Sequence, residues 1–348
     1  MERILYGVSG VGIGHAIRSK VVICELLKKY DMKIVASGFS YDYLNGYFKD
    51  KVINIDGFEM AFRNNKIDSI NTILNNMKKV SFHNYLNFLE VGKELNKFNP
   101  SVVISDWEPY SSFYSFNESV PLIIIGNAHF LAYGKFSVKL KHILDYIRFR
   151  FFLRTLIFPA RYYIINCLPK MKLNENKKIR RASGLIRDEI FRSKPKKKDY
   201  VFVYQSTDTN NNLIEVLMKI NEKFIIYGFS FNGRKGNLVF KKFDDSKEFI
   251  KDFVNSKAVI SNGGFTLISE AIYLQKPMLL VPIKHHYEQI LNAQHVFEQG
   301  FGEIVEEITV ENVWNFLDKK YKIIKSNHES NNQFFKLLEG TIRKCLKK

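Results

Sequence analysis

Cysteine is scarce in this chain: 348 residues contain 3, namely Cys24, Cys167 and Cys345. An odd number of widely separated cysteines argues against a disulfide framework and indicates a reducing compartment. Their spacing matches no pattern of metal ligands. The N-terminus lacks the basic, apolar and small-residue regions of a signal peptide, and no apolar run has membrane-spanning length. The sequence therefore predicts a cytoplasmic protein.

Acidic residues are also few. Asp and Glu number 35 against 53 Lys and Arg, which gives a formal net charge of +18. This excess predicts attraction to polyanions, anionic membrane surfaces or phosphorylated small molecules, and charge alone does not choose among them. The hydrophobic content of 46% and the charged content of 25% are typical of globular proteins. A chain of this length usually forms two domains.

A glycine-rich turn, Ser9 to His15, follows a predicted strand at residues 3–8 and precedes helical periodicity over residues 16–30. It is not a dinucleotide-binding fingerprint, because His15 stands where the third glycine would fall and the second strand, at residues 33–36, ends without an acid. A nicotinamide cofactor is therefore disfavoured. The positive end of the helix dipole favours a neutral His15, which suits a general base. A capping role is the alternative.

Strands and helices continue to alternate, with strands predicted at residues 52–55, 102–105 and 121–126. Asp106 follows the second of these strands, at the carboxyl end where open α/β sheets bind their ligands. It could orient the His15 imidazole and stabilise its positive charge. Alternatively, Asp106 caps the next helix. It could also form a metal-binding carboxylate pair with Glu108, although two acids alone are weak evidence for a metal.

Residues 135–163 are basic and aromatic, with seven Lys or Arg residues and one acid. They predict either a helix in an anionic membrane interface or a long helix that packs its aromatic rings on the sheet and exposes its arginines. Single-stranded nucleic acid is disfavoured as a partner because no stacking motif accompanies the charge. The candidate membrane or acceptor residues are Arg148, Phe149, Arg150, Phe152 and Arg154.

A second α/β unit is predicted after the basic segment at residues 192–198, where a domain linker ends. Residues 162–167 are the predicted last strand before a polar run at 169–181. Helical periodicity is present at residues 67–95, and a basic helix is predicted at 332–348. The second unit has predicted strands at residues 199–204, 223–228 and 238–240 and helices at 213–221 and 249–255.

Residues 258–294 hold the most informative motif of the chain. A buried strand at 258–261 leads into Asn262-Gly263-Gly264, and a helix, a strand at 278–282 and a polar loop follow. Two residues without Cβ let backbone N–H groups approach a phosphate at the start of a helix. The strands are apolar on both faces, as in parallel sheets. The pattern predicts a site for the phosphates of a nucleotide.

These residues resemble the GT-B glycosyltransferases of the MurG and UDP-glucuronosyltransferase-like group. The resemblance implies two Rossmann-like domains facing across a cleft. Residues 1–185 would form the acceptor domain, with helix 332–348 packed back on it, and residues 186–331 the donor domain. The matching motifs are Gly12-x-Gly14-His15-x-x-Arg18, Asn262-Gly263-Gly264, Glu270-Ala271, Lys276-Pro277-Met278, Val281-Pro282, Glu288-Gln289 and Asn292-Ala293.

The resemblance also implies donor contacts. Gly263 and Gly264 would present amides to the diphosphate, Glu270 would accept hydrogen bonds from the ribose hydroxyls, and Glu288 and Gln289 would hold the sugar hydroxyls. By position alone, three further residues are implied: Ser206 and Thr207 for phosphate and Phe243 for the base. The chain departs from the family pattern in having Asn262 in place of His and Glu288 in place of Asp.

The function implied is an inverting, metal-independent transfer of a sugar from a nucleotide diphosphate sugar, with a family preference for uridine, to an acceptor hydroxyl. His15 would be the base on the turn that Gly12 and Gly14 shape, and Asp106 would assist it. Amides and a helix dipole would stabilise the leaving diphosphate without a cofactor. The acceptor would be a glycan or a lipid-linked molecule at the inner face of the cell membrane.

Two alternative functions remain open. A nucleotide-sugar hydrolase similar to those of pseudaminic acid synthesis shares the Gly-x-Gly-His-x-x-Arg turn and uses water as acceptor. A non-catalytic protein that binds polyanions or membranes would also account for the charge.

Overall fold

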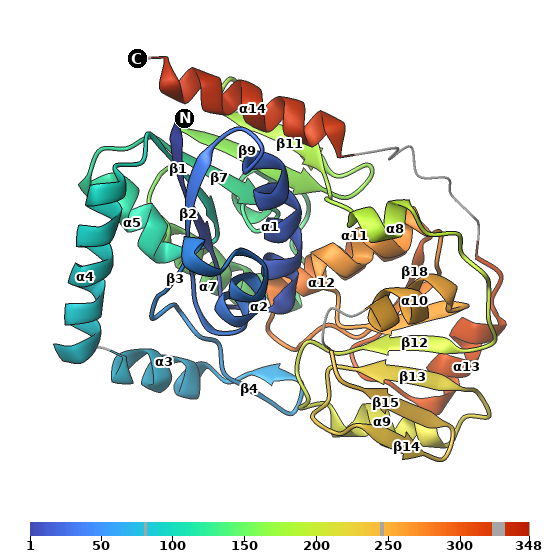
Figure 1. Cartoon of the computed structure of the whole chain (residues 1–348). Coiled ribbons are helices and arrows are strands. Elements are labelled where there is room, and N and C mark those ends of the chain that lie inside the picture. The colour runs from blue at the N-terminus through green and yellow to red at the C-terminus, as the bar shows by residue number, and fades with distance from the viewer. Residues whose placement is uncertain (80–81, 244–246, 322–330, 348) are drawn as a thin grey trace. The chain divides into compact units, whose positions relative to one another are not determined.

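The computed structural model describes residues 1–79, 82–243, 247–321 and 331–347. The chain divides into two compact units, each built on a seven-stranded sheet (Figure 1). Unit 1 comprises Met1–Ala61, Asp68–Leu185 and Ser330–Lys348, and unit 2 comprises Phe62–Ile67 and Ile186–Glu329. The predicted α/β class is therefore confirmed. The second predicted boundary, at residue 331, adjoins residues 322–330, which lie outside the described residues.

The sheet of unit 1 is parallel throughout, in the order β11-β9-β7-β6-β1-β2-β3. Its central strands are apolar on both faces because helices cover both, and all five residues of β6 are buried. The strands are β1 (Arg3–Val8), β2 (Asp31–Ala36), β3 (Val52–Asn54), β6 (Val102–Asp106), β7 (Leu122–Gly126), β9 (Tyr162–Cys167) and β11 (Ile179–Ser183).

The C-terminal helix α14 (Asn332–Leu346) runs alongside β11 in unit 1 (Figure 1). Its apolar face places Phe334, Leu338 and Ile342 in the same core as Ile104 of β6. Helix α14 therefore covers part of the sheet of unit 1. The other helices of the unit are α1 (Ile13–Leu26), α2 (Gly38–Phe48), α3 (Ser69–Lys78), α4 (Phe82–Phe98), α5 (Pro109–Asn117), α6 (Phe130–Tyr133) and α7 (Ile143–Leu156).

Two predictions for unit 1 are corrected. The polar run after β9 contains a further strand, β11, which pairs parallel with β9. Its pattern was missed because only Ile179 and Ala182 are buried, whereas its arginines face solvent at the sheet edge. The basic aromatic segment forms the 14-residue helix α7, shorter than the predicted long helix. Among the described residues, no helix combines the length and apolarity needed to cross a membrane.

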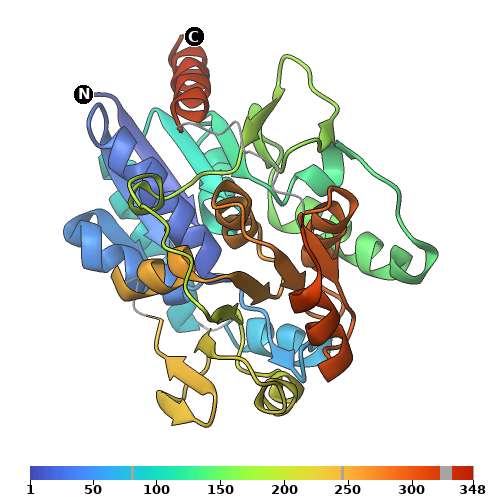
Figure 2. The ribbon, with the colours of Figure 1, turned by 90° about the vertical axis from the view of Figure 1, so that its right-hand side faces the viewer.

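Unit 2 has the strand order β14-β15-β13-β12-β16-β17-β18, with every pair parallel except β14 and β15. That antiparallel pair lies at the sheet edge (Figure 2). The elements are β12 (Val201–Tyr204), β13 (Phe224–Tyr227), β14 (Gly233–Lys235), β15 (Leu238–Lys241), β16 (Ala258–Ser261), β17 (Met278–Leu280), β18 (Gly302–Ile304), α8 (Asp188–Phe191), α9 (Asn211–Met218), α10 (Lys247–Asn255), α11 (Phe265–Tyr273), α12 (Tyr287–Glu298) and α13 (Val310–Asp318).

Two features of unit 2 differ from the sequence predictions. The polar stretch after β17, predicted as a loop, forms helix α12, whose inner face buries Ile290, Leu291 and Val296. The hairpin of β4 (Phe62–Arg63) and β5 (Lys66–Ile67) belongs to this unit although unit 1 surrounds it in the sequence. Neither short strand has the length that makes a hydrophobic period visible.

Candidate active site

Two neighbouring strands of unit 1 bring the predicted acid and base together. β1 and β6 run parallel with Val8 opposite Asp106, so the turn after β1 and the last residue of β6 lie side by side at the carboxyl ends of these strands. The turn has Gly12 at φ 87°, a conformation that glycine adopts without steric cost. His15, in the first turn of α1, places its Nδ1 3.0 Å from Oδ1 of Asp106. The predicted proximity of these two side chains is therefore observed.

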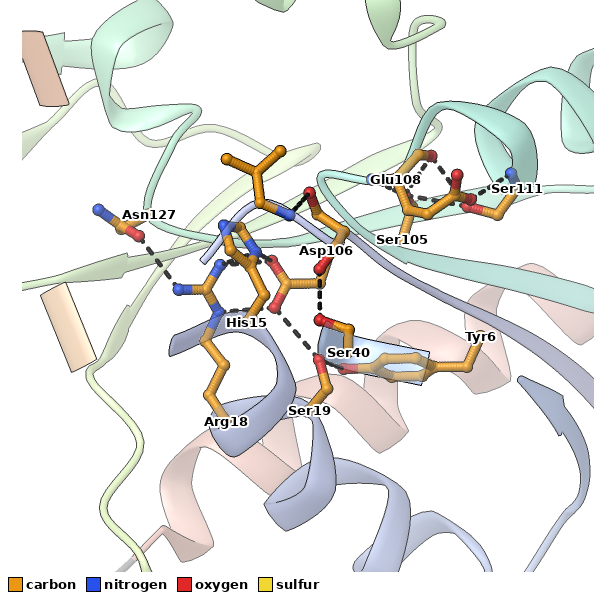
Figure 3. Close-up of polar contacts among 12 residues, drawn as sticks. Tyr6, His15, Arg18, Ser19, Ser40, Ser105, Asp106, Glu108, Ser111 and Asn127 are labelled. Carbon is orange, nitrogen blue, oxygen red and sulfur yellow. Dashed lines mark hydrogen bonds and ion pairs between the residues drawn. The ribbon is translucent and has the colours of Figure 1, made fainter. Parts of the chain in front are cut away.

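Arg18 is the third member of this cluster (Figure 3). Its Nε donates to Oδ2 of Asp106 at 2.6 Å and its Nη2 to Oδ1 at 2.5 Å, a bidentate pair in which both side chains are buried. Arg18 Nη1 also lies 3.5 Å from Oδ1 of Asn127. Burial alone would raise the pKa of Asp106, but the Arg18 guanidinium and His15 outweigh burial and hold this pKa below its ordinary value. Asp106 is thus a fixed negative charge.

The Nδ1 atom of His15 faces both an acceptor and a donor. Asp106 Oδ1 is 3.0 Å away and Nη2 of Arg18 is 2.7 Å away. With the proton on Nδ1, the imidazole donates to Asp106 and leaves the lone pair of Nε2 for an external proton. With Nδ1 unprotonated, Arg18 donates to it and Nε2 carries the proton. The first tautomer is the one that a general base requires.

Trp107 packs against the imidazole ring of His15. Its ring stacks on His15 with centroids 6.1 Å apart and on Phe149 of α7 at 6.2 Å. The backbone of Trp107 has φ 53°, in the left-handed region that costs free energy for a large side chain. The indole is 6% exposed, and its Nε1 has no hydrogen-bond partner among the described residues. Packing of this strained residue holds the His15 ring in place.

Glu108, not Asp106, caps the next helix, so the capping alternative for Asp106 is wrong. The Glu108 carboxylate accepts from the backbone N–H groups of Tyr110 at 2.7 Å and Ser111 at 2.5 Å at the start of α5. Burial raises the pKa of Glu108 to about 7, against the opposing effect of these hydrogen bonds. Because each carboxylate is directed to its own donors, the pair does not form the metal-ligand arrangement that the spacing suggested.

A cavity of about 510 Å³ lies near this cluster in unit 1. Phe58 lines it and packs edge-on against Trp107, with ring centroids 6.2 Å apart. The cavity therefore borders the aromatic wall behind His15 and offers mainly apolar surface. Its other lining residues include Ile55, Asn76, Lys79, Phe88, Val91, Tyr110 and Leu156.

The glycine turn of unit 2 follows β16 and starts α11. Gly263 has φ 110°, and a Cβ there would come within 2.9 Å of the Gln289 carbonyl oxygen, so only glycine fits. Gly264 is the N-cap of α11, is exposed, and has open space where a Cβ would point. The first N–H groups of α11 have no partners within the helix, and its dipole is positive at this end. The turn can therefore accept an anion.

Asn262 is part of the scaffold beneath this turn. It is 1% exposed. Its Oδ1 accepts from the N–H of Ser206 at 2.8 Å, and its Nδ2 donates to Oε1 of Gln205 at 2.9 Å and to the carbonyl of Val281 at 3.2 Å. The side chain joins three loops that follow β12, β16 and β17. Asn262 thus fixes the position of the turn, whereas Ser206 is exposed beside it.

Glu270 has a different partner from the one that the resemblance implies. Its carboxylate is fully buried and accepts from Arg187, at 2.8 Å from Nε and 2.7 Å from Nη2. Arg187 is 4% exposed. A ribose hydroxyl would have to displace one arm of this bidentate pair to reach Glu270. The structure therefore makes Glu270 a partner of Arg187 and gives it no open face.

The remaining predicted donor residues lie around the same turn. Gln289 is buried, and its Oε1 accepts from the N–H of Ile283, so it supports the loop after β17. Glu288 is half-buried in the first turn of α12. Thr207 lies after β12, with its Oγ1 3.0 Å from that of Thr209. Phe243 packs on Phe249 at 4.8 Å in the aromatic cluster that also contacts Arg187.

The candidate membrane residues of α7 divide into two groups. Arg148 and Arg154 are exposed, but Phe149 is 5% exposed against Trp107, so a surface role for Phe149 does not hold. Phe152 is half-buried and packs on Phe58, and Arg150 donates to the Tyr146 hydroxyl. Exposed arginines and packed aromatic rings agree with the second of the two alternatives predicted for this segment. The exposed large apolar residues of α7 are Ile143, Leu144, Ile147 and Phe151.

Sequence reasoning assigned no role to four residues that shape these sites. Arg18 was within the quoted glycine-turn motif, and its spacing from His15 places both on one face of α1. Trp107, Asn127 and Arg187 had no readable signal, because their partners are distant in the sequence. Gly14, also from the motif, lies within the first turn of α1.

Two α/β units with mainly parallel sheets, one with a His–Asp pair and the other with a glycine turn at a helix start, are the arrangement of glycosyltransferases of the GT-B fold. The chain belongs to the glycosyl transferase family 1, whose model matches residues 2–320. Solved structures agree in fold. MurG of Acinetobacter baumannii is similar with a TM-score of 0.54, 12% identity and coverage of 92% of this chain and 91% of that one.

A second solved structure and one curated relative extend the comparison. LpCGTa, solved in complex with UDP, has a TM-score of 0.60 and 12% identity, covering 91% of this chain and 89% of that one. The UDP-N-acetylglucosamine–N-acetylmuramyl-(pentapeptide) pyrophosphoryl-undecaprenol N-acetylglucosamine transferase 3 of Bacillus cereus is 34% identical over 76 residues. That match spans 21% of this chain and 21% of the relative. The protein is an enzyme, so the non-catalytic alternative is set aside.

Proposed function

We propose that the protein transfers a sugar from a nucleotide diphosphate sugar, UDP-linked, to an acceptor hydroxyl with inversion and without a metal ion or cofactor. The cluster of His15, Asp106 and Arg18 carries this proposal, because it is an oriented base backed by a fixed negative charge. His15 Nε2 takes the hydroxyl proton as the acceptor oxygen attacks the anomeric carbon. The bond from that carbon to the diphosphate oxygen breaks, and the nucleoside diphosphate leaves with the electron pair.

The donor is proposed to bind at the glycine turn of unit 2. A Cβ at Gly264 would meet nothing within 4 Å, which leaves room for a phosphate at the start of α11, and the first N–H groups of this helix would stabilise the charge that develops on the leaving diphosphate. Ser206 is exposed on the neighbouring loop as a further donor. Uridine is the proposed base because relatives carry UDP in their names or titles.

The acceptor is proposed to be lipid-linked and reached at an anionic membrane surface. Unit 1 exposes apolar side chains on two helices, among them Ile70, Ile73 and Met77 of α3 and Leu144 and Phe151 of α7. Exposed arginines accompany them on α7. Apolar insertion combined with basic residues is the pattern of interfacial helices. A relative's name likewise specifies a pyrophosphoryl-undecaprenol acceptor.

Replacement of His15 tests the transfer mechanism. We expect His15→Ala to abolish sugar transfer, measured as nucleoside diphosphate release that depends on acceptor, while UDP affinity stays at the wild-type value. His142→Ala, which alters a histidine at the start of α7, is the control. Transfer by His15→Ala near the wild-type rate would remove His15 from the base role. If wild-type protein releases free sugar at a rate that no acceptor raises, the enzyme is the hydrolase.

Vesicle flotation tests the membrane part. Wild-type protein should float with anionic vesicles at low salt and much less with neutral ones. Leu144→Ser combined with Phe151→Ser should reduce flotation, whereas Met218→Ser combined with Phe231→Ser, which removes exposed apolar side chains of unit 2, should not. Failure of the wild type to float with anionic vesicles would overturn the membrane proposal and leave the transfer chemistry unaffected.

A further inference from the structure

The hairpin β4–β5 is packed on the loops of unit 2 that surround the glycine turn. Lys66 forms a parallel bridge with Lys284, in the loop after β17. The Lys284 N–H donates to the carbonyl of Asn65 at 2.9 Å, and the Ile67 N–H donates to the carbonyl of Lys284 at 3.1 Å. A segment from the N-terminal half of the sequence therefore pairs, through its backbone, with the loop after β17.

The tip of this hairpin is shaped for its position. Asn64 and Asn65 have φ 49° and 52°, the left-handed pair of a tight hairpin turn that asparagine tolerates better than most residues. Asn64 is exposed, but Asn65 is 8% exposed. The Asn65 N–H donates to Oγ1 of Thr209, in the loop after β12. The tip thus contacts two of the loops that flank the glycine turn.

The Asn65 side chain reaches the turn itself. Its Oδ1 lies 3.4 Å from Nδ2 of Asn262, the residue that precedes Gly263. Asn262 also holds the N–H of Ser206 and the carbonyl of Val281. Because one buried amide connects all these groups, a displacement of the hairpin tip would alter the positions of Ser206 and of the glycine turn together.

The hairpin also carries two positive charges side by side. Arg63 and Lys66 are directly opposite each other in the β4–β5 pair, and both are exposed. Neither has an ion-pair partner within the described part of the chain. Two like charges on neighbouring strands repel unless an anion lies near them. Their element contacts the loops where the diphosphate is proposed to bind.

We propose that the hairpin Phe62–Ile67 is an element of the donor site. Asn65 is a positioning residue that holds the glycine turn and Ser206 through Asn262, and Arg63 and Lys66 supply positive charge to the donor diphosphate. This inference rests on the proposed function. It makes donor recognition depend on a segment that lies far from the rest of unit 2 in the sequence.

Glycine substitutions at the two tip residues test the positioning role in the full-length protein. Both positions have positive φ, which glycine adopts freely, so Asn65→Gly removes the side chain and keeps the backbone, and Asn64→Gly is the matched control. By calorimetry we expect Asn65→Gly to weaken UDP binding about three- to tenfold, the effect of one hydrogen bond. Asn64→Gly should bind as the wild type does.

A conservative variant separates positioning from general damage. Asn65→Ser keeps a neutral oxygen acceptor for Asn262 and adds no negative charge beside the diphosphate, so it should bind UDP more tightly than Asn65→Gly does. With a UDP-sugar donor, Asn65→Gly should raise the donor KM and leave kcat nearly unchanged. Equal UDP affinity in Asn65→Gly, Asn64→Gly and the wild type would overturn the positioning role. If the wild type binds no nucleoside diphosphate, the proposed function itself fails.

Charge removal tests the second part. Arg63→Ser combined with Lys66→Ser should weaken UDP binding about fivefold at low salt and make the affinity less dependent on salt. The matched control, Arg234→Ser combined with Lys235→Ser, removes the same charge from the edge strand β14. Equal UDP affinities and salt dependences in the two double variants would overturn the charge contribution.

Discussion

The two units solve different problems at the carboxyl ends of their sheets. In unit 1, Asp106, Arg18 and His15 form a charged cluster with little exposure. In unit 2, Asn262 organises neutral amides and hydroxyls beside the turn at Gly264, and Arg63 and Lys66 lie on the hairpin that contacts these loops. A group that moves protons must titrate and needs a fixed charge beside it. A group that holds phosphate needs N–H donors that are already oriented. Amides that supply them are neutral and need no opposite charge beside them.

The largest expected effect comes from neutralising the fixed charge in unit 1. Asp106→Asn removes the carboxylate that forms a bidentate ion pair with the buried Arg18, which should cost about 3–5 kcal/mol in unfolding free energy. It should also lower the transfer rate by about 10³- to 10⁴-fold, because the His15 tautomer is no longer imposed. UDP affinity should not change if the two sites are independent.

Steady-state kinetics, UDP calorimetry and urea unfolding together check this prediction. Asp31→Asn, at a half-exposed acid of the same unit, is the control and should alter none of the three measurements. A transfer rate for Asp106→Asn within a factor of about three of the wild type would contradict the role of Asp106.

In unit 2, removing one partner of the buried ion pair should lower the stability of the fold more than removing both partners. Arg187→Met leaves Glu270 buried without its partner, and we expect a loss of about 3–5 kcal/mol in unfolding free energy. Combining it with Glu270→Leu should recover much of this loss, because the unpaired charge is also removed. Urea unfolding of Arg187→Met, Glu270→Leu and the double variant measures these changes in free energy. Additive losses would show that the pair is not coupled.

Two glycines of the turn should separate folding from donor binding. Gly263→Ala forces a Cβ to within 2.9 Å of the Gln289 carbonyl at φ 110°, and should cost about 1–3 kcal/mol in stability. Gly264→Ala meets nothing within 4 Å, so the melting temperature should stay unchanged. Its methyl group would occupy the proposed phosphate space, and UDP affinity should fall about tenfold. Normal UDP binding by a stable Gly264→Ala would place the diphosphate elsewhere.

The smallest expected effect concerns pH. The folded pKa of Glu108 is raised by burial from 4.5 to about 7, so between these values the folded protein holds a proton that the unfolded chain has lost. Stability from this group therefore falls as pH rises through that window. Glu108→Gln mimics the protonated form, and above pH 7 it should exceed the wild type by about 1–2 kcal/mol in unfolding free energy.

A comparison of the two proteins at each pH isolates this effect. Burial lowers the pKa of His129 to about 4, which gives a stability slope of opposite sign below pH 6.5. Because both proteins contain His129, its contribution cancels in the difference. Parallel stability curves for the wild type and Glu108→Gln from pH 4.5 to 8 would contradict the raised pKa.

Much of the fold was readable because its signals are local. The strand at Arg3–Val8 and the helix near Asn332 were predicted within a few residues, since buried parallel strands and amphipathic helices have clear periods. β11 was missed because an edge strand buries one face only in part. Helix α12 was predicted as a loop because it contains many polar residues, which contact the neighbouring loops.

The site was less predictable than the fold. His15 and Asp106 could be paired from the rule that parallel strands end at one edge, without any knowledge of their distance. The partner of Glu270 could not be predicted, because Arg187 lies 83 positions away and precedes a short helix. The burial of Phe149 was equally hidden, since either face of α7 has aromatic rings.

The sequence by itself determined most of the elements, the glycine turns and the resemblance to the family, because backbone conformation and hydrophobic period depend on residues close together in the chain. Only the tertiary structure decided which charges are paired, which aromatic face is buried, and that Phe62–Ile67 packs with unit 2. Those features depend on contacts between residues separated by tens to hundreds of positions. Such contacts form only when burial offsets the entropy of bringing distant segments together.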